Sequence, residues 1–409
     1  MIEIISPDTE IDFLEIQRPF MMLSGVVLLA CILGVVFIGP RYGIDFKGGT
    51  ELIIRFEKSL NSKEVRTAMD KAGVKAEQVQ QFGEKKDNEY LIQTTKVSVV
   101  GPKTKAKAGP NDIPAEAIAE KVKGVTDVKE WEWAKENPDR LDLTFPEGGS
   151  IPEEQVISAV EELGLAEVEL KSLTTGGLKK YVLRFQGLQQ SIEQGLAEAL
   201  PEGFKPDTEG AVSGIERMET VGPRVGKQLR NSGILSVLVA LFCILVYVAF
   251  RFDLRYAPGA VAALTHDVII AVGFFTVTQL EITLPIIAAL LTIVGYSLND
   301  TIVVFDRIRE NVESTAREPL DEISNRSLNE TLSRTLITSI TTLLAVTAIA
   351  ILGGGLIQNF AIALIVGVTV GTYSSVFVAT PIMLRMDTFL EEWRESREKA
   401  QKAKSSSAV

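Results

Sequence analysis

Six long apolar segments dominate the hydrophobic pattern of this chain. Each has about 17–25 residues, which is enough for a helix to cross a hydrocarbon core of about 30 Å. The segments are Phe20–Gly39, Ile234–Phe250, Ala257–Leu280, Ile282–Phe305, Leu336–Leu352 and Phe360–Leu384. No comparable segment occurs between residues 40 and 232. The pattern therefore predicts an α-helical membrane bundle of six transmembrane helices, with one large soluble domain between the first helix and the second.

The soluble domain shows strand and helix patterns in an order that repeats. A strand pattern, a helix pattern and a second strand pattern occur in sequence, and the same order recurs about 90 residues later. The first copy is "ELIIRF" (51–56), "NSKEVRTAMDKAG" (61–73) and "NEYLIQT" (88–94), and the second is "RLDLTF" (140–145), "PEEQVISAVEELG" (152–164) and "KKYVLRF" (179–185). Chance similarity between two ordinary β-α-β units is one explanation. We favour duplication, which predicts two tandem α+β modules of ferredoxin-like type.

Lysine and arginine in the short loops predict the orientation of the helices, because such residues are enriched in cytoplasmic loops. They follow the second, fourth and sixth apolar segments, whereas the alternate loops contain none. The residues are Arg251, Arg255, Arg307, Arg309, Arg317, Arg326, Arg385, Arg394, Arg397 and Lys399. Both termini are therefore expected to be cytoplasmic and the soluble domain exterior. The acidic residues before the first segment argue against a cleaved signal peptide.

Charged and amide side chains interrupt the apolar pattern at three places. His266 and Asp267 lie about ten residues into the third segment, near the expected bilayer midplane. Asn299 and Asp300 lie in the fourth segment, and Arg334 stands at the start of the fifth. A charge at the bilayer centre costs roughly 2.5–3.5 kcal/mol on insertion scales, so such residues usually pair with one another or mark an ion path.

These residues predict a proton-coupling site formed by Asp300, Arg334 and Asn299. A buried carboxylate can exchange a proton, and a nearby arginine, which stays cationic, can act on that exchange. The alternative is a static pair that joins two helices. For His266 and Asp267, a proton path and a structural hydrogen-bonded pair explain the sequence equally well, so these two residues are secondary candidates.

Composition excludes several classes of function. The one histidine of the chain lies in a membrane segment, so a catalytic triad or a histidine-ligated metal site in the soluble domain is not expected. The two cysteines, Cys31 and Cys243, also lie in membrane segments and imply no disulfide framework. The net charge of −11 argues against a nucleic-acid partner. We therefore expect neither an enzyme nor a protein that needs a metal or an organic cofactor.

Several motifs together resemble those of the SecF family, within the RND-like superfamily. The motifs are "YGIDFKGGTEL" after the first helix, "VGPRVGKQLR" (221–230) before the second, "GYSLNDTIVVFDRIREN" (295–311), "RTLITSITTLL" and "VGTYSSVFVATPIML". The resemblance covers all six membrane helices and both ends of the soluble domain. The long motif that contains Asp300 is the most specific of them.

The resemblance implies an auxiliary subunit of the bacterial Sec protein translocase. Such a subunit couples the proton-motive force to late-stage movement of exported proteins across the inner membrane. In this family the aspartate of "LND" and the arginine that opens the next helix are the proposed proton-coupling pair, which correspond to Asp300 and Arg334. The implied partners are a SecD-like six-helix subunit, the SecYEG translocon with SecA, accessory proteins similar to YidC and YajC, exported unfolded polypeptides and membrane lipid.

One departure from the family pattern concerns the exterior domain, because SecF-like chains usually contain one α+β module there. The expected division of this chain is a cytoplasmic N-terminus (1–19), helix 1 (20–39), module 1 (40–100), a linker (101–114), module 2 with the lead-in to helix 2 (115–232), helices 2–4 (233–305), a cytoplasmic amphipathic segment (306–334), helices 5–6 (335–384) and a cytoplasmic tail (385–409). Two rival functions remain. One is RND-type proton-driven efflux of a small molecule or lipid, and the other is a translocon scaffold that moves no protons.

Overall fold

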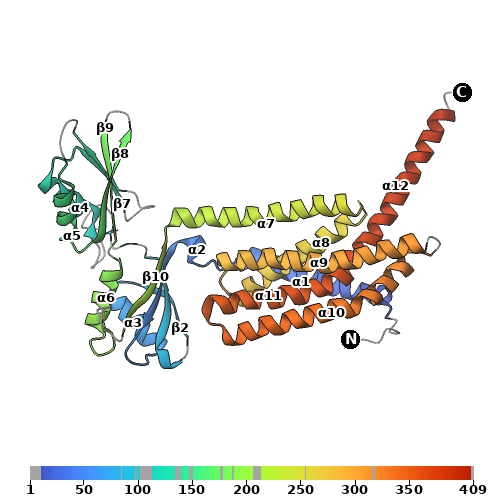
Figure 1. Ribbon diagram of the computed structural model, residues 1–409, viewed down its shortest axis with the longest axis horizontal. Helices are drawn as coiled ribbons and strands as arrows, with labels where there is room; N and C mark the ends of the chain where they lie inside the picture. The colour runs from blue at the N-terminus through green and yellow to red at the C-terminus, as the bar shows by residue number, and fades with distance from the viewer. Residues whose placement is uncertain are drawn as a thin grey trace. The chain divides into compact units, whose positions relative to one another are not determined.

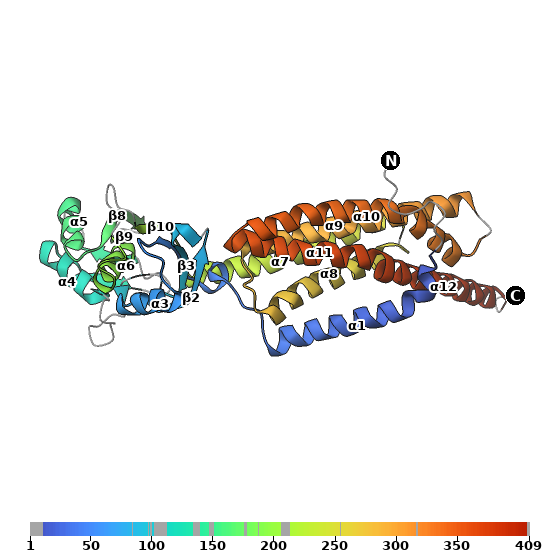
Figure 2. The same ribbon diagram turned by 90° about the horizontal axis from the view of Figure 1, so that it is seen from below.

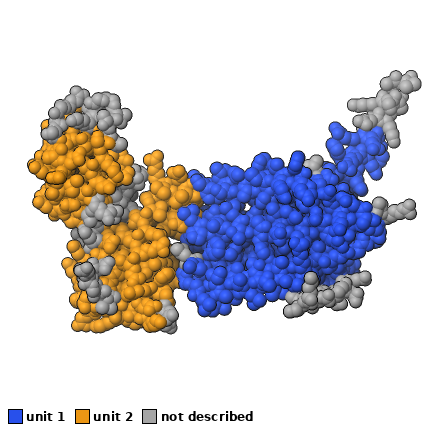
Figure 3. Space-filling model, in the orientation of Figure 1, with its two compact units in different colours: residues 1–42, 231–409 blue, residues 43–230 orange. Residues whose placement is uncertain are grey.

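The structure is a computed structural model (Figure 1) that describes residues 11–406 apart from 84, 97, 99, 102–112, 134–139, 147–150, 176–177, 187, 206–212, 254 and 316–317. The chain forms two compact units (Figure 3). One unit, the membrane unit, contains residues 1–42 and 231–409, and the other, the exterior unit, contains residues 43–230.

The membrane unit consists of long helices that lie alongside one another (Figure 2). They are α1 (Phe13–Phe37), α7 (Pro223–Arg251), which begins in the exterior unit, α8 (Ala257–Thr278), α9 (Leu284–Ser314), α10 (Leu320–Leu352), α11 (Gly355–Ser374), the π-helical turn η3 (Ser375–Ala379) and α12 (Thr380–Ser406). Within the described residues, six helical segments are long and apolar enough to cross a membrane. The predicted six-helix membrane bundle is confirmed, and α8 is its most buried helix.

Helices α9 and α10 extend well beyond their apolar segments. The expected amphipathic segment 306–334 is divided between two helices, because its first part ends α9 and its second part begins α10. Pro319 precedes α10 and cannot continue a helix from the preceding turn. The two helix ends are joined by an ion pair of 2.5 Å between Arg307 and Glu330 and by a hydrogen bond of 2.9 Å from Asn311 Nδ2 to Ser327 Oγ.

Glycines allow the helices of the bundle to approach closely. A Cβ atom on Gly273 of α8 would overlap with Cys31 of α1, and one on Gly367 of α11 would overlap with Ile293 of α9. At Gly371 a Cβ atom would lie 3.0 Å from the Cβ of Ser297. The small side chains of α11 thus serve close helix packing, as expected for a small residue at every fourth position.

The exterior unit contains a first antiparallel sheet with strands in the order β10-β1-β3-β2. Its elements are β1 (Gly49–Arg55), α3 (Ser62–Lys71), β2 (Ala76–Phe82), β3 (Glu89–Thr94), α6 (Leu188–Ala199) and β10 (Gly214–Val221). Alternate residues of the central strands, such as Leu52, Ile54 and Ile92, are fully buried in the core of this unit. The succession β-α-β-β-α-β is the ferredoxin-like arrangement.

A second sheet has the strand order β6-β7-β9-β8. Its elements are α4 (Ala115–Val125), β6 (Glu130–Trp133), β7 (Arg140–Phe145), α5 (Glu153–Glu161), β8 (Ala166–Thr175) and β9 (Leu178–Gln186). The elements β7, α5, β8 and β9 occupy the places of β1, α3, β2 and β3, whereas α4 and β6 precede them in the chain. The second module is therefore a circularly permuted version of the first.

The second module is inserted into the first, between β3 and α6 (Figure 1). The expectation that residues 115–232 form one module differs from the structure, because α6 packs on α3 and β10 pairs with β1. The reason lies in strand pairing over more than 160 residues, which no local pattern reveals. The buried apolar residues of both modules form one continuous core.

The glycine pair Gly48–Gly49 lies where the short helix α2 (Ile44–Lys47) turns into β1. Both glycines have positive φ angles, 79° and 148°. A Cβ atom on Gly48 would lie 2.8 Å from the Cα of Pro223, and one on Gly49 would overlap with the carbonyl oxygen of Thr94. Only glycine fits both positions without strain, so the pair joins α2, β1 and the first turn of α7.

We expect Gly49→Ala to lower the free energy of unfolding by about 2 kcal/mol, because a side chain there combines an unfavourable φ with a steric overlap. Gly124→Ala in α4 is the matched control. It meets no atom within 4 Å, so it is expected to be neutral or stabilising by about 0.5–1 kcal/mol. Denaturant titration of the purified chain measures both changes. Equal effects of the two substitutions would contradict this account of the glycine pair.

Replacement of residues 102–186 by a short flexible linker should leave the first sheet folded, because all six of its elements lie outside that range. The expected product inserts into membranes and melts cooperatively, at a lower temperature than the intact chain because the shared core is smaller. Deletion of residues 188–199 is the control, since it removes the fully buried Ile192 and Leu196. Aggregation of the first variant, detected by size-exclusion chromatography in detergent, would show that the first module depends on the second.

Candidate functional site

Asp300 is a buried carboxyl group without a complete set of hydrogen bonds. It lies on α9, its side chain is 2 % exposed, and its Oδ2 atom has no hydrogen-bond partner among the described residues. The neighbouring Thr301 Oγ1 is also buried without a partner. A buried polar atom that lacks a partner costs about 1–3 kcal/mol, and more when it is charged. The site therefore favours any species, such as a proton, that satisfies the free oxygen.

Arg334 lies on α10 and interacts electrostatically with Asp300. The side chain of Arg334 is exposed on the surface of this chain, and no ion pair in the described part of the chain includes it. Asn299 is also exposed, although it precedes Asp300 directly. The structure thus brings Arg334 and Asp300 within electrostatic range, whereas Asn299 points away from the buried carboxyl group.

Asp267 has the opposite environment, since both of its oxygens accept hydrogen bonds. Its Oδ1 atom lies 2.9 Å from His266 Nδ1, and its Oδ2 atom accepts hydrogen bonds from Ser297 Oγ at 2.6 Å and from Ser374 Oγ at 2.8 Å. The other ring nitrogen of His266 lies 2.5 Å from Ser24 Oγ. We call these five residues the Asp267 network. It joins α1, α8, α9 and α11 inside the bundle.

The Asp267 network ends one helical turn from Asp300. Residues three apart on a helix are neighbours on one face, so Ser297 and Asp300 lie on the same side of α9. Asp267 is 0 % exposed and has three donor groups around it, which is the arrangement that stabilises a buried carboxylate. The two aspartates therefore differ in hydrogen bonding. Both carboxylate oxygens of Asp267 have partners, whereas Oδ2 of Asp300 has none among the described residues.

Hydroxyl groups of Tyr296, Ser339 and Thr372 form a second, partly buried hydrogen-bonded connection. Tyr296 Oη donates to Ser339 Oγ at 3.2 Å, and Ser339 Oγ lies 2.6 Å from Thr372 Oγ1, so the connection runs from α9 through α10 to α11. No sequence pattern indicated these residues or the three serines of the Asp267 network. Serine and threonine are common in membrane helices. The only signal for these residues is that small side chains tend to lie where two membrane helices pack closely.

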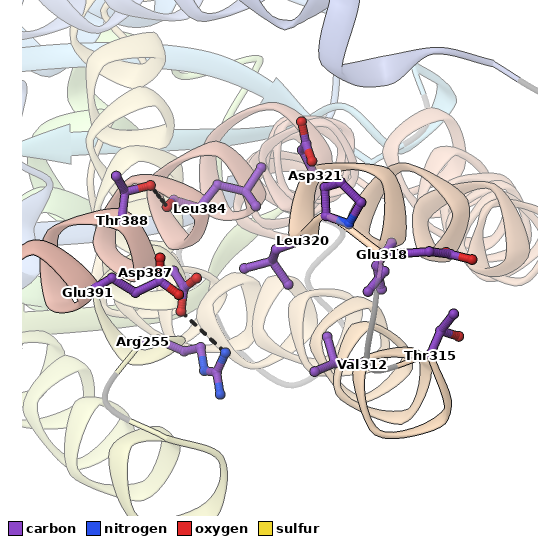
Figure 4. Close-up of a pocket in the computed structure, with 12 residues that line it drawn as sticks. Arg255, Val312, Thr315, Glu318, Leu320, Asp321, Leu384, Asp387, Thr388 and Glu391 are labelled. Carbon is purple, nitrogen blue, oxygen red and sulfur yellow. Dashed lines mark hydrogen bonds and ion pairs between the residues drawn. The ribbon is translucent and has the colours of Figure 1, made fainter.

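A cavity of the membrane unit lies away from these residues. It has a volume of about 560 Å³ and is bounded by the first turns of α10, the end of α9, Arg255 and α12 (Figure 4). At the edge of this cavity Asp387 forms an ion pair with Arg255, with 3.2 Å between Asp387 Oδ1 and Arg255 Nη1. None of its lining residues belongs to the Asp267 network or contacts Asp300. Among the described residues, no cluster of three histidine, cysteine, aspartate or glutamate side chains could hold a metal ion.

Comparison with protein families gives two matches. Residues 206–388 match the model of the C-terminal region of the protein export membrane proteins SecD and SecF, and residues 34–59 match the SecD/SecF GG motif. The second match contains the glycine pair Gly48–Gly49, and the first contains Asp267, Asp300 and Arg334. Both matches therefore include the positions that the structure shows to be conformationally or electrostatically unusual.

Relatives that match this chain over nearly their whole length are named protein translocase subunit SecF. The chain is 36 % identical to the protein translocase subunit SecF of Koribacter versatilis, over 95 % of this chain and 94 % of that protein. It is 34 % identical to the SecF subunit of Vibrio alginolyticus, over 94 % and 93 % of the two chains. Such identity over nearly the whole length extends the match beyond the membrane helices to the exterior unit.

A solved structure has the same fold. The crystal structure of SecDF from Thermus thermophilus, a translocon-associated membrane protein, matches 94 % of this chain with a TM-score of 0.59 and 27 % identity. The match covers 40 % of that longer chain. With six membrane helices, the glycine motif and relatives of matching length, the chain belongs to the SecF family of protein translocase subunits.

Proposed function

We propose that this subunit couples the proton-motive force to late-stage movement of exported proteins across the bacterial inner membrane, with Asp300 as the group that binds and releases the proton. The observation that carries this proposal is the buried Oδ2 atom of Asp300, which has no hydrogen-bond partner in the described part of the chain. A proton on this carboxyl group removes the buried charge. Loss of the proton leaves a charge that Arg334 stabilises from α10.

Arg334 acts on Asp300 from a distance in this structure. Because the guanidinium group is exposed and the two side chains form no ion pair, a small movement of α10 relative to α9 would change their separation. Coulomb energy varies inversely with distance, and its magnitude is large where water is excluded. Movement of these helices would thereby change the proton affinity of Asp300. This link converts proton binding into helix movement and the reverse.

His266 and Asp267 have a different role in this proposal. All polar atoms of the Asp267 carboxylate have partners on neighbouring helices, so neither proton binding nor proton loss removes an unsatisfied group there. We infer that the Asp267 network holds α1, α8, α9 and α11 together beside the moving site. Of the two explanations that the sequence leaves open, the hydrogen-bond geometry favours the structural one.

A second chain is expected to cover the exposed polar face of α9 and α10. Small or polar side chains that are exposed on these helices include Ala288, Thr292, Asn299, Arg334 and Thr341. An arginine that faces lipid costs roughly 2.5–3.5 kcal/mol or more, and small residues allow close approach of another helix. We propose that a SecD-like six-helix subunit packs here and completes the environment of Arg334.

The remaining assembly follows from the family. We propose that the complex works with the SecYEG translocon and SecA, with accessory proteins similar to YidC and YajC, on unfolded exported polypeptides. The arginine-rich ends of α9 and α12 support cytoplasmic termini, which makes the exterior unit periplasmic. A proton that crosses 100 mV releases about 2.3 kcal/mol, and no organic cofactor is required for that energy to be used.

Asp300→Asn should keep the shape and polarity of the side chain but abolish proton exchange. We expect the proton-dependent increase in export rate to disappear, a change of up to about 50-fold per 100 mV for one proton. The measurement follows a trapped export intermediate in inverted membrane vesicles, with and without a proton gradient. Arg334→Met should have a similar effect, because the deprotonated form of Asp300 would lose its stabilising charge.

Asp267→Asn is the matched control for the same experiment. It is expected to lower the thermal stability of the detergent-solubilised chain while the surviving complex still responds to the gradient. Completion of export at the wild-type rate by Asp300→Asn would exclude Asp300 as the coupling carboxylate and would favour a scaffold that moves no protons. Loss of the response only in Asp267→Asn would transfer the coupling role to the Asp267 network.

Thr292→Trp on the exposed face of α9 should displace the second six-helix chain. Val239→Trp on α7, which is 50 % exposed, is the control and is expected to leave the complex intact. Copurification from detergent-solubilised membranes, followed by identification of the bound chains, measures both effects. Full activity of this chain in vesicles as a monomer or homo-oligomer would contradict the proposed partner and would favour a self-sufficient efflux protein.

A further inference from the structure

The first turns of α12 beyond the last apolar segment carry an exposed apolar stripe. It consists of Met386, Phe389, Leu390 and Trp393, which we call the α12 stripe. The spacing i, i+3, i+4 and i+7 places all four side chains on one face of the helix. Phe389 is 57 % exposed and Trp393 is 47 % exposed, so the membrane unit itself leaves the aromatic part of this stripe open.

The charged residues nearest to the α12 stripe are arginines. With 3.6 residues per turn, Arg397 lies on the line of the α12 stripe, and Arg385 and Arg394 lie at its two edges. The guanidinium group of Arg397 lies 4.4 Å from the centre of the Trp393 ring. The carboxylates lie farther from the stripe than any of these arginines. They are Asp387, Glu391, Glu392, Glu395 and Glu398.

The acidic side of α12 faces the rest of the membrane unit. Leu384, Asp387, Thr388 and Glu391 line the cavity at the start of α10, as Figure 4 shows. Asp387 pairs there with Arg255, and farther along the helix Lys399 pairs with Glu395 at 3.3 Å. Because the α12 stripe is on the opposite side of the helix, it is turned away from the connection between α9 and α10. The stripe therefore faces the surroundings of the bundle.

We propose that residues 385–397 bind the surface of an anionic bilayer, with the α12 stripe in the interfacial region and Arg385, Arg394 and Arg397 on lipid phosphates. Two features favour a lipid surface over a protein partner. The stripe directly follows a segment expected to cross the membrane, which ends at Leu384, so it begins at the membrane surface. The charged residues nearest to its borders are arginines, which is the arrangement of helices that lie on anionic membranes.

The aromatic residues suit this position. Tryptophan is enriched at membrane interfaces because its ring is apolar and its N–H group can remain hydrated. Arginine beside it can extend to the phosphate level while its stem stays on the apolar surface. Such binding would require α12 to tilt toward the membrane plane, because a helix along the membrane normal rises 1.5 Å per residue and would carry Trp393 past the headgroups. The proposal is independent of proton coupling by Asp300.

The test uses the fluorescence of Trp393 in the full chain. The chain has three tryptophans, so Trp131→Phe with Trp133→Phe leaves Trp393 as the sole one. This protein is reconstituted into vesicles of equal parts phosphatidylglycerol and phosphatidylcholine, with either lipid brominated on its acyl chains. If the double variant does not fold, the fluorescence of Trp393 is obtained as the difference between the fluorescence of the native chain and that of Trp393→Phe. This second measurement leaves the exterior unit unchanged.

We expect brominated lipid to quench Trp393, and brominated phosphatidylglycerol to do so several-fold more strongly than brominated phosphatidylcholine. Substitution of Arg385, Arg394 and Arg397 by glutamine should abolish that preference, since each arginine contributes about fivefold to binding at an anionic surface. The matched control replaces Glu392, Glu395 and Glu398 by glutamine and should keep the preference.

Absence of quenching by either brominated lipid would overturn the proposal. Quenching without any preference for phosphatidylglycerol would overturn its electrostatic part. If Trp393 is unquenched in vesicles but becomes shielded from aqueous iodide in membranes that contain the complete translocase, the α12 stripe is a protein-binding surface instead. Export activity is not a readout in these measurements, so their outcome is distinguishable from a failure of the proton-coupling proposal.

Discussion

The requirement that polar atoms inside an apolar bundle be hydrogen-bonded governs the arrangement of the membrane helices. Asp267 meets this requirement with donors from His266, Ser297 and Ser374, and so joins α8 to α9 and α11. Asp300, on the same side of α9 as Ser297, does not meet it. One aspartate can therefore stabilise the bundle while the other retains the capacity to change its protonation state. The contrast explains how Asp267, which holds the helices together, and Asp300, which lacks a hydrogen-bond partner among the described residues, can be neighbours.

In the proposed function, the exposure of Arg334 connects the site at Asp300 to assembly. Arg334 acts on Asp300 but is exposed, and it lies near small and polar residues that a lipid environment would not favour. Relatives of matching length are subunits, and the solved SecDF structure is a chain of which this one matches 40 %. An arginine at the boundary between two six-helix units would respond to movements of both. The exposed face is thus part of the proposed mechanism as well as of the proposed interface.

The exterior unit shows how an additional module can be accommodated without disruption of the original fold. The inserted module begins after β3 and ends before α6, which are consecutive elements of the β-α-β-β-α-β succession of the first module. The glycine pair at Gly48–Gly49 lies beside the end of β3 and the first turn of α7, because a Cβ atom on Gly49 would overlap with the carbonyl oxygen of Thr94 and one on Gly48 would lie 2.8 Å from the Cα of Pro223. The connection to the membrane helix is therefore formed by the first module.

The sequence by itself determined the six membrane helices, the α+β character of the exterior unit and the identity of Asp300 and Arg334 as unusual residues, because apolar length, alternation and an isolated charge are local properties. Tertiary structure decided the rest. The assignment of α6 and β10 to the first sheet depends on pairing between Gly49 and Val221, which are distant in the chain. The difference between Asp267 and Asp300 depends on serines from three other helices, and serine has no distinctive pattern in a membrane segment. Hydrogen-bond satisfaction is a property of the packed bundle, so no single segment could predict it.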